Sequence, residues 1–261
     1  MKFYFYIFST LAVLFLPVGL WAAEPADHLF VYLAIRQDGS VLADEEILFS
    51  SRSSQQGVFI RTIPLRLQTP YGTVRLRVAD VQVVDANDVA YPFVVRQTND
   101  AAEIRIDTPS VSTDGQQFYI VRYRVDGAIL PASGHDYFFW NATGSGWTGG
   151  IKEVSVKVDF PSPVTIEANL LTDCTVVGAT SRVCDQQLRA YDQQGGIPSV
   201  GFQQDSGVIA GESLVVSVAL PSGVLVQPPS AGQKFIQEFM LPALAVVAVL
   251  CLGVLTRRQL T

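Results

Sequence analysis

Short runs of alternating apolar and polar residues fill most of this chain between residues 29 and 220. Examples are the eight- or nine-residue runs 29–36, 41–49, 117–125 and 213–220. Such alternation is typical of β-strands, whose successive side chains point to opposite faces. No window in the same region has the period of a persuasive amphipathic helix. The pattern predicts a mainly β fold, arranged as an antiparallel β-sandwich.

Turn-forming residues separate the predicted strands. Asp38-Gly39, between two apolar runs, predicts a hairpin, and Pro64 closes a strand over residues 58–65. The aromatic and glycine-rich residues 136–150 are predicted to form a long connection. The remaining predicted strands cover residues 73–84, followed by a turn at 85–88, and then residues 89–95, 103–107, 151–160 and 164–170.

The N-terminal residues have the composition of a secretory signal. Residues 3–20 are apolar after the single Lys2, and the small residues Ala22 and Ala23 follow. This pattern predicts a signal peptide over residues 1–23. An uncleaved membrane anchor is the alternative, because the apolar stretch is longer than a usual signal core.

A second apolar segment lies near the C-terminus. It predicts a single transmembrane helix over residues 236–256, at the short end of the length that spans a bilayer. Arg257 and Arg258 follow it, so the positive-inside rule places residues 257–261 in the cytoplasm. Residues 224–235, with two prolines and a glycine, are expected to link this helix to the β domain. A sorting tail that is cut off and replaced by another anchor is the alternative.

Together the two ends predict a single-pass protein of the cell membrane whose residues 24–223 form an extracytoplasmic β-sandwich domain. The chain without Lys2, Arg257 and Arg258 has 15 basic and 24 acidic residues, a net charge of −9. That charge argues against nucleic acid as a partner and against electrostatic docking on anionic lipid. The expected partners are the membrane, through the C-terminal helix, and an unknown protein or cell-envelope glycan.

Two of the three cysteines lie in the predicted exported region. Cys174 and Cys184 are ten residues apart, which in an oxidising compartment predicts a disulfide that closes a short loop. The surrounding residues 171–204 are weakly patterned and are interpreted as either a small subdomain or an excursion from a sheet. No metal site and no cofactor are expected, and the acidic residues 44–46 are interpreted as a solvated strand edge.

Three stretches resemble one known family. They are GVFIRTIP at residues 57–64, YIVRY at residues 119–123 and, most specifically, DYFFWNATGSGW at residues 136–147. Over residues 28–220 the chain resembles the YciQ-like predicted membrane proteins, a domain of unknown function numbered 2207. A difference is Gly149-Gly150 before Ile151, where the family often has a proline. The resemblance implies a bacterial or archaeal membrane protein with a β-rich outer domain, and it implies no particular reaction.

The strongest candidate ligand site is the aromatic stretch 136–147. Flat aromatic faces beside a few directed polar groups are suited to holding a sugar or a peptide. The alternative is structural: a turn that glycine permits would fold both tryptophans onto the sandwich, with Asn141 capping backbone groups. The candidate residues in this stretch are Asp136, Trp140, Asn141, Thr143 and Trp147.

Arg61 is the sixth candidate residue. It is expected to pair with Asp136, Glu45 or Glu46, and a buried pair of this kind usually fixes register rather than doing chemistry. We expect no enzyme, because no catalytic set of residues is recognisable. The main hypothesis is a membrane-anchored binding module. The alternatives are a glycan-directed lectin-like domain or hydrolase that uses residues 136–147, and a surface structural protein processed at its tail.

Overall fold

The computed structural model describes residues 25–50, 57–108, 116–132, 134–144, 146–161, 170–191 and 195–225. These residues form seventeen strands, which confirms the predicted mainly β class. Across these ranges no helix is both long enough and apolar enough to span a bilayer. The predicted signal peptide, the C-terminal membrane helix and most of the predicted strand 164–170 lie outside the described residues.

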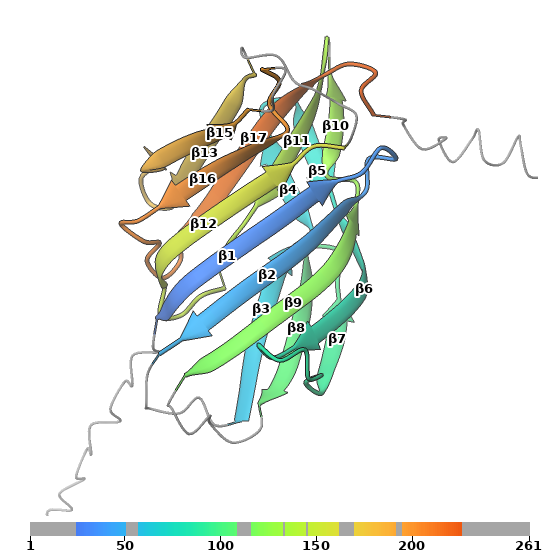
Figure 1. The fold of residues 1–261 in the computed structure, drawn as a ribbon. Coiled ribbons are helices and arrows are strands. Elements are labelled where there is room, and N and C mark those ends of the chain that lie inside the picture. Colours follow the sequence, from blue (N-terminus) through green and yellow to red (C-terminus); the bar gives the residue numbers. More distant parts are fainter. Residues whose placement is uncertain are drawn as a thin grey trace, which may run out of the picture.

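One layer of the fold is a seven-stranded sheet, seen in front in Figure 1. Strands β1 and β2 lie near its centre, and β6 and β15 form its edges. In order across the sheet, the strands are β15 (Gln186–Ala190), β16 (Ser199–Gln204), β12 (Ile151–Asp159), β1 (Ala26–Ile35), β2 (Val41–Phe49), β9 (Gln117–Asp126) and β6 (Arg77–Val84).

The prediction of a wholly antiparallel arrangement is wrong at one place. Strands β1 and β12 pair in parallel, with Leu29 opposite Val154 and Leu33 opposite Val158. Alternation along a strand is the same in either direction, so the sequence pattern does not distinguish the two. A parallel pair needs a long crossover, which here contains all the strands from β2 to β11.

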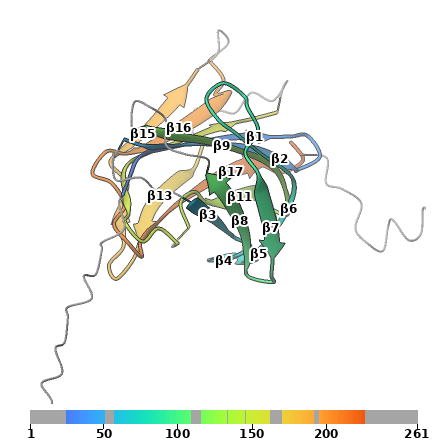
Figure 2. The same ribbon diagram turned by 90° about the horizontal axis from the view of Figure 1, so that it is seen from below.

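Three smaller sheets form the other layer, and Figure 2 shows them below the seven-stranded sheet. The five-stranded sheet contains β10 (Ile129–Ala132), β11 (His135–Asn141), β17 (Ser213–Pro221), β13 (Thr172–Val177) and β14 (Arg182–Val183). The three-stranded sheet contains β3 (Gly57–Pro64), β8 (Ala101–Thr108) and β7 (Phe93–Gln97), and β4 (Arg66–Thr69) pairs with β5 (Gly72–Arg75).

The core lies between the layers and follows directly from the alternation. In β1 the side chains of Leu29, Val31 and Leu33 are fully buried, while the residues between them are partly exposed. Burial of each such side chain contributes roughly 1.5–3 kcal/mol relative to exposure. The hairpin predicted at Asp38-Gly39 is confirmed: it joins β1 to β2, and Gly39 has the positive φ of 77° that a side chain would oppose.

Several strand boundaries differ from the predictions; for example, strand β7 covers residues 93–97 rather than 89–95. The predicted strand 73–84 divides at Leu76, whose N–H donates to the Leu65 carbonyl at 2.8 Å, so that β5 and β6 belong to different sheets. Residues 136–141 of the predicted connection belong instead to strand β11. Aromatic side chains favour strands, but here they occupy both faces and mask the alternation.

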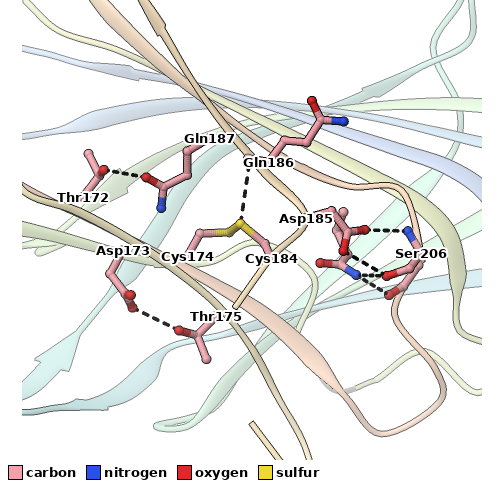
Figure 3. Close-up of a disulfide and its surroundings, with 11 residues drawn as sticks. Thr172, Asp173, Cys174, Thr175, Cys184, Asp185, Gln186, Gln187 and Ser206 are labelled. Atoms are coloured by element: carbon pink, nitrogen blue, oxygen red, sulfur yellow. Dashed lines mark hydrogen bonds between the residues drawn. A yellow bond between two sulfur atoms is a disulfide. The ribbon is translucent and has the colours of Figure 1, made fainter. Parts of the chain in front are cut away.

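The weakly patterned region 171–204 contributes strands to both main layers. Strand β13 pairs with β17 in the five-stranded sheet, and β16 pairs with β12 in the seven-stranded sheet. The predicted disulfide between Cys174 and Cys184 is present, with the two Cα atoms 5.5 Å apart (Figure 3). It joins β13 to the residue that follows β14, so it fixes this short hairpin at the margin of its sheet.

Candidate functional site

A buried ion pair connects the two layers. Arg61 of β3 is 1% exposed, and its Nε and Nη2 donate to the two carboxylate oxygens of Glu45 at 2.5 and 2.8 Å. Glu45 lies on β2, so this two-pronged contact joins the three-stranded sheet to the seven-stranded sheet. Of the partners predicted for Arg61, the structure therefore selects Glu45 rather than Asp136 or Glu46.

The rest of the Arg61 guanidinium binds backbone carbonyls. Nη1 donates to the carbonyls of Thr62 and Thr143 at 2.7 and 2.6 Å, and Nη2 donates to the Ala142 carbonyl at 3.0 Å. With the two bonds to Glu45, these contacts use all five N–H donors of an arginine. The guanidinium is therefore fully engaged, and it also fixes the segment after β11.

Glu45 is not part of a solvated strand edge, so that interpretation of residues 44–46 is wrong. Its side chain is fully buried because it alternates with Ala43 and Ile47 on the inward face of β2, where it meets Arg61 from the other layer. The Tyr123 hydroxyl of β9 donates to Glu45 Oε1 at 2.5 Å. Burial, and then the neighbouring Glu45 carboxylate, raises the pKa of the Tyr123 phenol well above its ordinary value.

The charge of Arg61 is retained despite its burial. Burial alone would lower the pKa of the guanidinium, but the attraction of the Glu45 carboxylate outweighs this effect and raises the pKa. A buried ion pair of this kind is costly to break because the remaining partner becomes an unpaired buried charge. These features indicate a structural clasp between the sheets.

The segment after β11 is held by its own side chains. The Asn141 Oδ1 accepts the Gly144 N–H at 2.8 Å, and Gly144 has a φ of 69°. The Thr143 hydroxyl accepts the Leu214 N–H at 2.9 Å, while Trp147 Nε1 donates to the Thr143 carbonyl at 2.8 Å. These contacts match the structural alternative for residues 136–147, in which Asn141 caps backbone groups.

The six predicted site residues do not form one surface. Arg61, Asn141, Thr143 and Trp147 lie together, whereas Trp140 is 1% exposed and belongs to the core. Asp136 is buried opposite Leu220, near the start of β11. At about 3.3 Å per residue, this position is roughly 16 Å along the strand from Asn141.

A hollow of about 380 Å³ adjoins Trp147. On one side it is lined by residues 58–62 of β3, and on the other by the glycine-rich residues 146–149, with Phe49 also contributing. The rings of Phe49, Phe59 and Trp147 lie 5.5–6.4 Å apart and form an aromatic wall. Arg61 lies behind this wall, 5.8 Å from the centre of the Trp147 ring.

Sequence reasoning missed Phe49, Phe59 and Ile60 as members of this site. Phe49 is the last residue of β2, and Phe59 alternates inward on β3 like an ordinary core residue. A signal was present in Val58 and Ile60, which are apolar residues at the outward positions of a strand. The pattern did not reveal that this strand is an edge.

A second aromatic group lies on the outer face of β11. The ring of Tyr137 stacks on that of Tyr71 at 4.1 Å, and Phe139 follows at 6.0 Å from Tyr137. Tyr71 belongs to the turn between β4 and β5 and is 51% exposed. The described residues include no cluster of three or more His, Cys, Asp and Glu side chains arranged for a metal ion.

A family model described as "Predicted membrane protein (DUF2207) N-terminal domain" matches residues 29–207. The chain belongs to this family. The match confirms the resemblance noted from the runs at residues 57–64, 119–123 and 136–147, and it covers the hollow beside Trp147 as well as the Arg61–Glu45 pair. No curated protein sequence matches the chain.

Among solved structures, the similarities to this DUF2207 domain are distant. Yeast LTA4 hydrolase is 12% identical with a TM-score of 0.43, over 74% of this chain and 28% of that one. An M1 zinc metallopeptidase from Deinococcus radiodurans is 14% identical with a TM-score of 0.36, over 74% and 42%. An aminopeptidase N family protein from Idiomarina loihiensis is 10% identical with a TM-score of 0.35, over 73% and 29%. The chain thus spans less than half of each of these proteins.

Proposed function

We propose that this protein is a membrane-anchored, extracytoplasmic β-sandwich module that binds a protein partner and has no chemistry of its own. The observation that carries the proposal is the hollow of about 380 Å³ beside Trp147, which combines an aromatic wall with exposed apolar side chains. Sites that bind ligands are concave and largely apolar, with a few polar groups that fix orientation. Family membership supports the membrane location.

The polar groups near the hollow favour binding over catalysis. The donors of Arg61, the carboxylate of Glu45 and the side chain of Thr143 are engaged with one another and with the backbone. A catalytic acid, base or nucleophile must instead reach a substrate atom directly or through one water. Beside polar residues such as Thr62 and Thr148, the hollow presents the rings of Phe59 and Trp147, and aromatic side chains are enriched in protein interfaces.

The test is capture from the solubilised envelope of the native organism. The full chain in detergent micelles serves as bait, with a photo-activated cross-linker to trap transient contacts. Trp147→Ala is the informative variant because Trp147 lines the hollow, whereas replacement of the buried Trp140 would damage the core. Capture of a specific protein by the wild type and its loss in the variant is the expected result. Equal capture by both would contradict the role of the hollow, and capture of no protein would contradict the module itself.

The outer face of β11 favours a second candidate, a glycan-binding function. The stacked rings of Tyr71 and Tyr137 offer a partly exposed aromatic surface, and sugars bind such surfaces through their apolar faces. Titration of the full chain with envelope glycans tests this function. Saturable binding that Tyr71→Ala abolishes would support it, and the absence of binding to every glycan would exclude it.

A further inference from the structure

Strand β3 is an edge strand whose outward backbone groups can be identified. Within the described residues it pairs with β8 alone. The Leu65 N–H donates to the Asp100 carbonyl at 2.8 Å, which makes this facing pair hydrogen-bonded. Because hydrogen-bonded pairs alternate along an antiparallel ladder, Arg61 and Phe59 also direct their backbone groups toward β8. The N–H and C=O groups of Val58, Ile60 and Thr62 therefore point away from β8.

One end of this edge is closed by the chain itself. The Thr62 carbonyl accepts Arg61 Nη1 at 2.7 Å. Gly144 and Gly146 lie so close to Thr62 that a Cβ on them would approach it to 2.9 and 3.2 Å, respectively. No hydrogen bond from another described residue reaches the outward backbone groups of Val58 and Ile60. The open part of the edge is thus limited to these two residues.

The hollow beside Trp147 lies along this open part. Residues 58–62 form one of its walls and residues 146–149 form the other, so it is a slot between an edge strand and a glycine-rich segment. Above the slot the side chains of Val58 and Ile60 are 38% and 52% exposed. Inside it, Phe59 and Trp147 present their rings.

The other edges of the three larger sheets have features that discourage pairing. Strands β10 and β14 have only four and two residues, and β10 contains Pro131. Strand β15 has five residues that include Arg189, β6 contains a bulge, and β7 has five residues that include Arg96. Short strands, prolines, bulges and charges are the usual protection of natural edges. Strand β3 has eight residues, and its one charged side chain, Arg61, is buried.

We propose that a partner protein adds an extended segment to the open edge of β3, with one apolar side chain inserted into the slot beside Trp147. This inference rests on the proposed binding function and names its ligand class. The edge selects an extended backbone because its outward N–H and C=O groups are spaced to pair with another strand. The aromatic wall selects a bulky apolar side chain at one position.

The pairing also limits the composition of the segment. Up to four backbone hydrogen bonds join it to Val58 and Ile60, so proline is excluded where an N–H is needed. The side chains next to the inserted one lie on the outer face, against the exposed parts of Val58 and Ile60. We therefore expect a proline-free segment of about four residues with apolar side chains on both faces.

The probe is a library of random octapeptides displayed on phage and selected on the full chain in detergent micelles. Enriched peptides are synthesised with a fluorophore, and their affinity is measured by anisotropy. Each is also made with N-methyl groups at alternate residues, in both registers, because this change removes N–H donors while retaining the side chains. We expect enrichment of sequences with a proline-free run of about four apolar residues, and loss of at least tenfold in affinity for one of the two methylated forms.

The chain provides a matched pair of variants. Ile60 and Val94 flank the same residue, Arg105, in the three-stranded sheet, and they are 52% and 56% exposed. Ile60→Glu places a charge at the open edge, whereas Val94→Glu places the same charge on β7. We expect a tenfold or greater loss of affinity for Ile60→Glu and less than a twofold change for Val94→Glu.

Three results would overturn the inference. They are no enrichment over a protein-free micelle, equal binding by the two variants, or a dimer of the chain that competes with the peptide and occupies the edge instead. Envelope capture is measured with the same variants. A partner that Ile60→Glu still captures would leave the proposed function standing while rejecting this edge as its site.

Discussion

Strands β3 and β6 are both edge strands of eight residues, but they differ in how far the rest of the chain covers their outer sides. The outer side of β6 is closed by its own chain: Gln97 Nε2 donates to the Val78 carbonyl at 2.7 Å, and the Tyr91 N–H donates to the Val83 carbonyl at 2.9 Å. A bulge around Asp80, which has a φ of 55°, interrupts the rest of it. The outer side of β3 is closed only near Thr62. At Val58 and Ile60, no hydrogen bond from another described residue reaches the outward backbone groups.

The difference contrasts an edge that contributes to stability with one that we propose binds a partner. A returning segment of the chain satisfies the edge of β6, so its polar groups contribute to the folded state. The Arg61 clasp anchors β3 to the rest of the fold through its inward side chain and through the Thr62 end of the edge, which leaves Val58 and Ile60 available without loosening the strand. Substitutions should therefore affect folding most at the clasp and least at the open edge.

Arg61→Ala is expected to have the largest effect. It leaves the Glu45 carboxylate buried without its charged partner, which typically costs about 3–5 kcal/mol of unfolding free energy. Urea denaturation followed by circular dichroism measures this loss. The control is Arg77→Ala, whose pair with Asp126 involves a side chain that is 76% exposed and should change stability by less than about 1 kcal/mol. Similar losses in the two variants would refute the clasp.

Tyr123→Phe removes one hydrogen bond from the same carboxylate. At neutral pH we expect a loss of about 1.5–3 kcal/mol, because the acceptor is charged and buried. The pKa of Tyr123 is raised in the folded state, so the unfolded chain loses the phenolic proton first as the pH rises above about 10. The wild type should therefore lose stability more steeply than the variant above that pH, by up to about 1.4 kcal/mol per pH unit. Parallel curves of unfolding free energy against pH would contradict this prediction.

Gln97→Ala opens the edge of β6 and should have a smaller effect. The variant removes the donor that the Val78 carbonyl accepts, and a hydrogen bond of this kind contributes about 0.5–1.5 kcal/mol. Gln82→Ala, at an exposed position of the same strand, provides the comparison and should differ from the wild type by less than about 0.5 kcal/mol. If the two variants were equally stable, the closure of β6 by Gln97 would have no energetic role.

The sequence predicts the parts of this comparison that depend on local pattern. Alternation located β2, β9 and β17 closely, and Asp38-Gly39 located the hairpin between β1 and β2. Local pattern does not predict which strands are edges, because whether a strand has one neighbour or two depends on pairing between residues far apart in the chain. Glu45 shows the same limit: three consecutive acidic residues indicate solvent, and only the contact with Arg61 explains why one of them is buried.

In the candidate site too, residues close in sequence were predicted better than residues that long-range pairing brings together or separates. Asn141, Thr143 and Trp147 were grouped correctly, because they are close in sequence and one short turn holds them. Asp136 was grouped with them on the assumption of a loop, but β11 extends its residues and places it at the other end of the strand. Phe49 was omitted because it approaches the site from a different sheet.

Ile60→Glu should have the smallest effect on folding and therefore gives the sharpest comparison with the clasp. The side chain is 52% exposed and faces Arg105 across the ladder, so we expect a change in unfolding free energy of less than about 0.5 kcal/mol. The same substitution at Val94, next to the same arginine, should give an equal result. A loss above about 1.5 kcal/mol that is specific to Ile60 would show that this edge supports the fold. Because the Arg61 clasp already holds the strand, we expect Ile60 to be dispensable for folding and needed for binding alone.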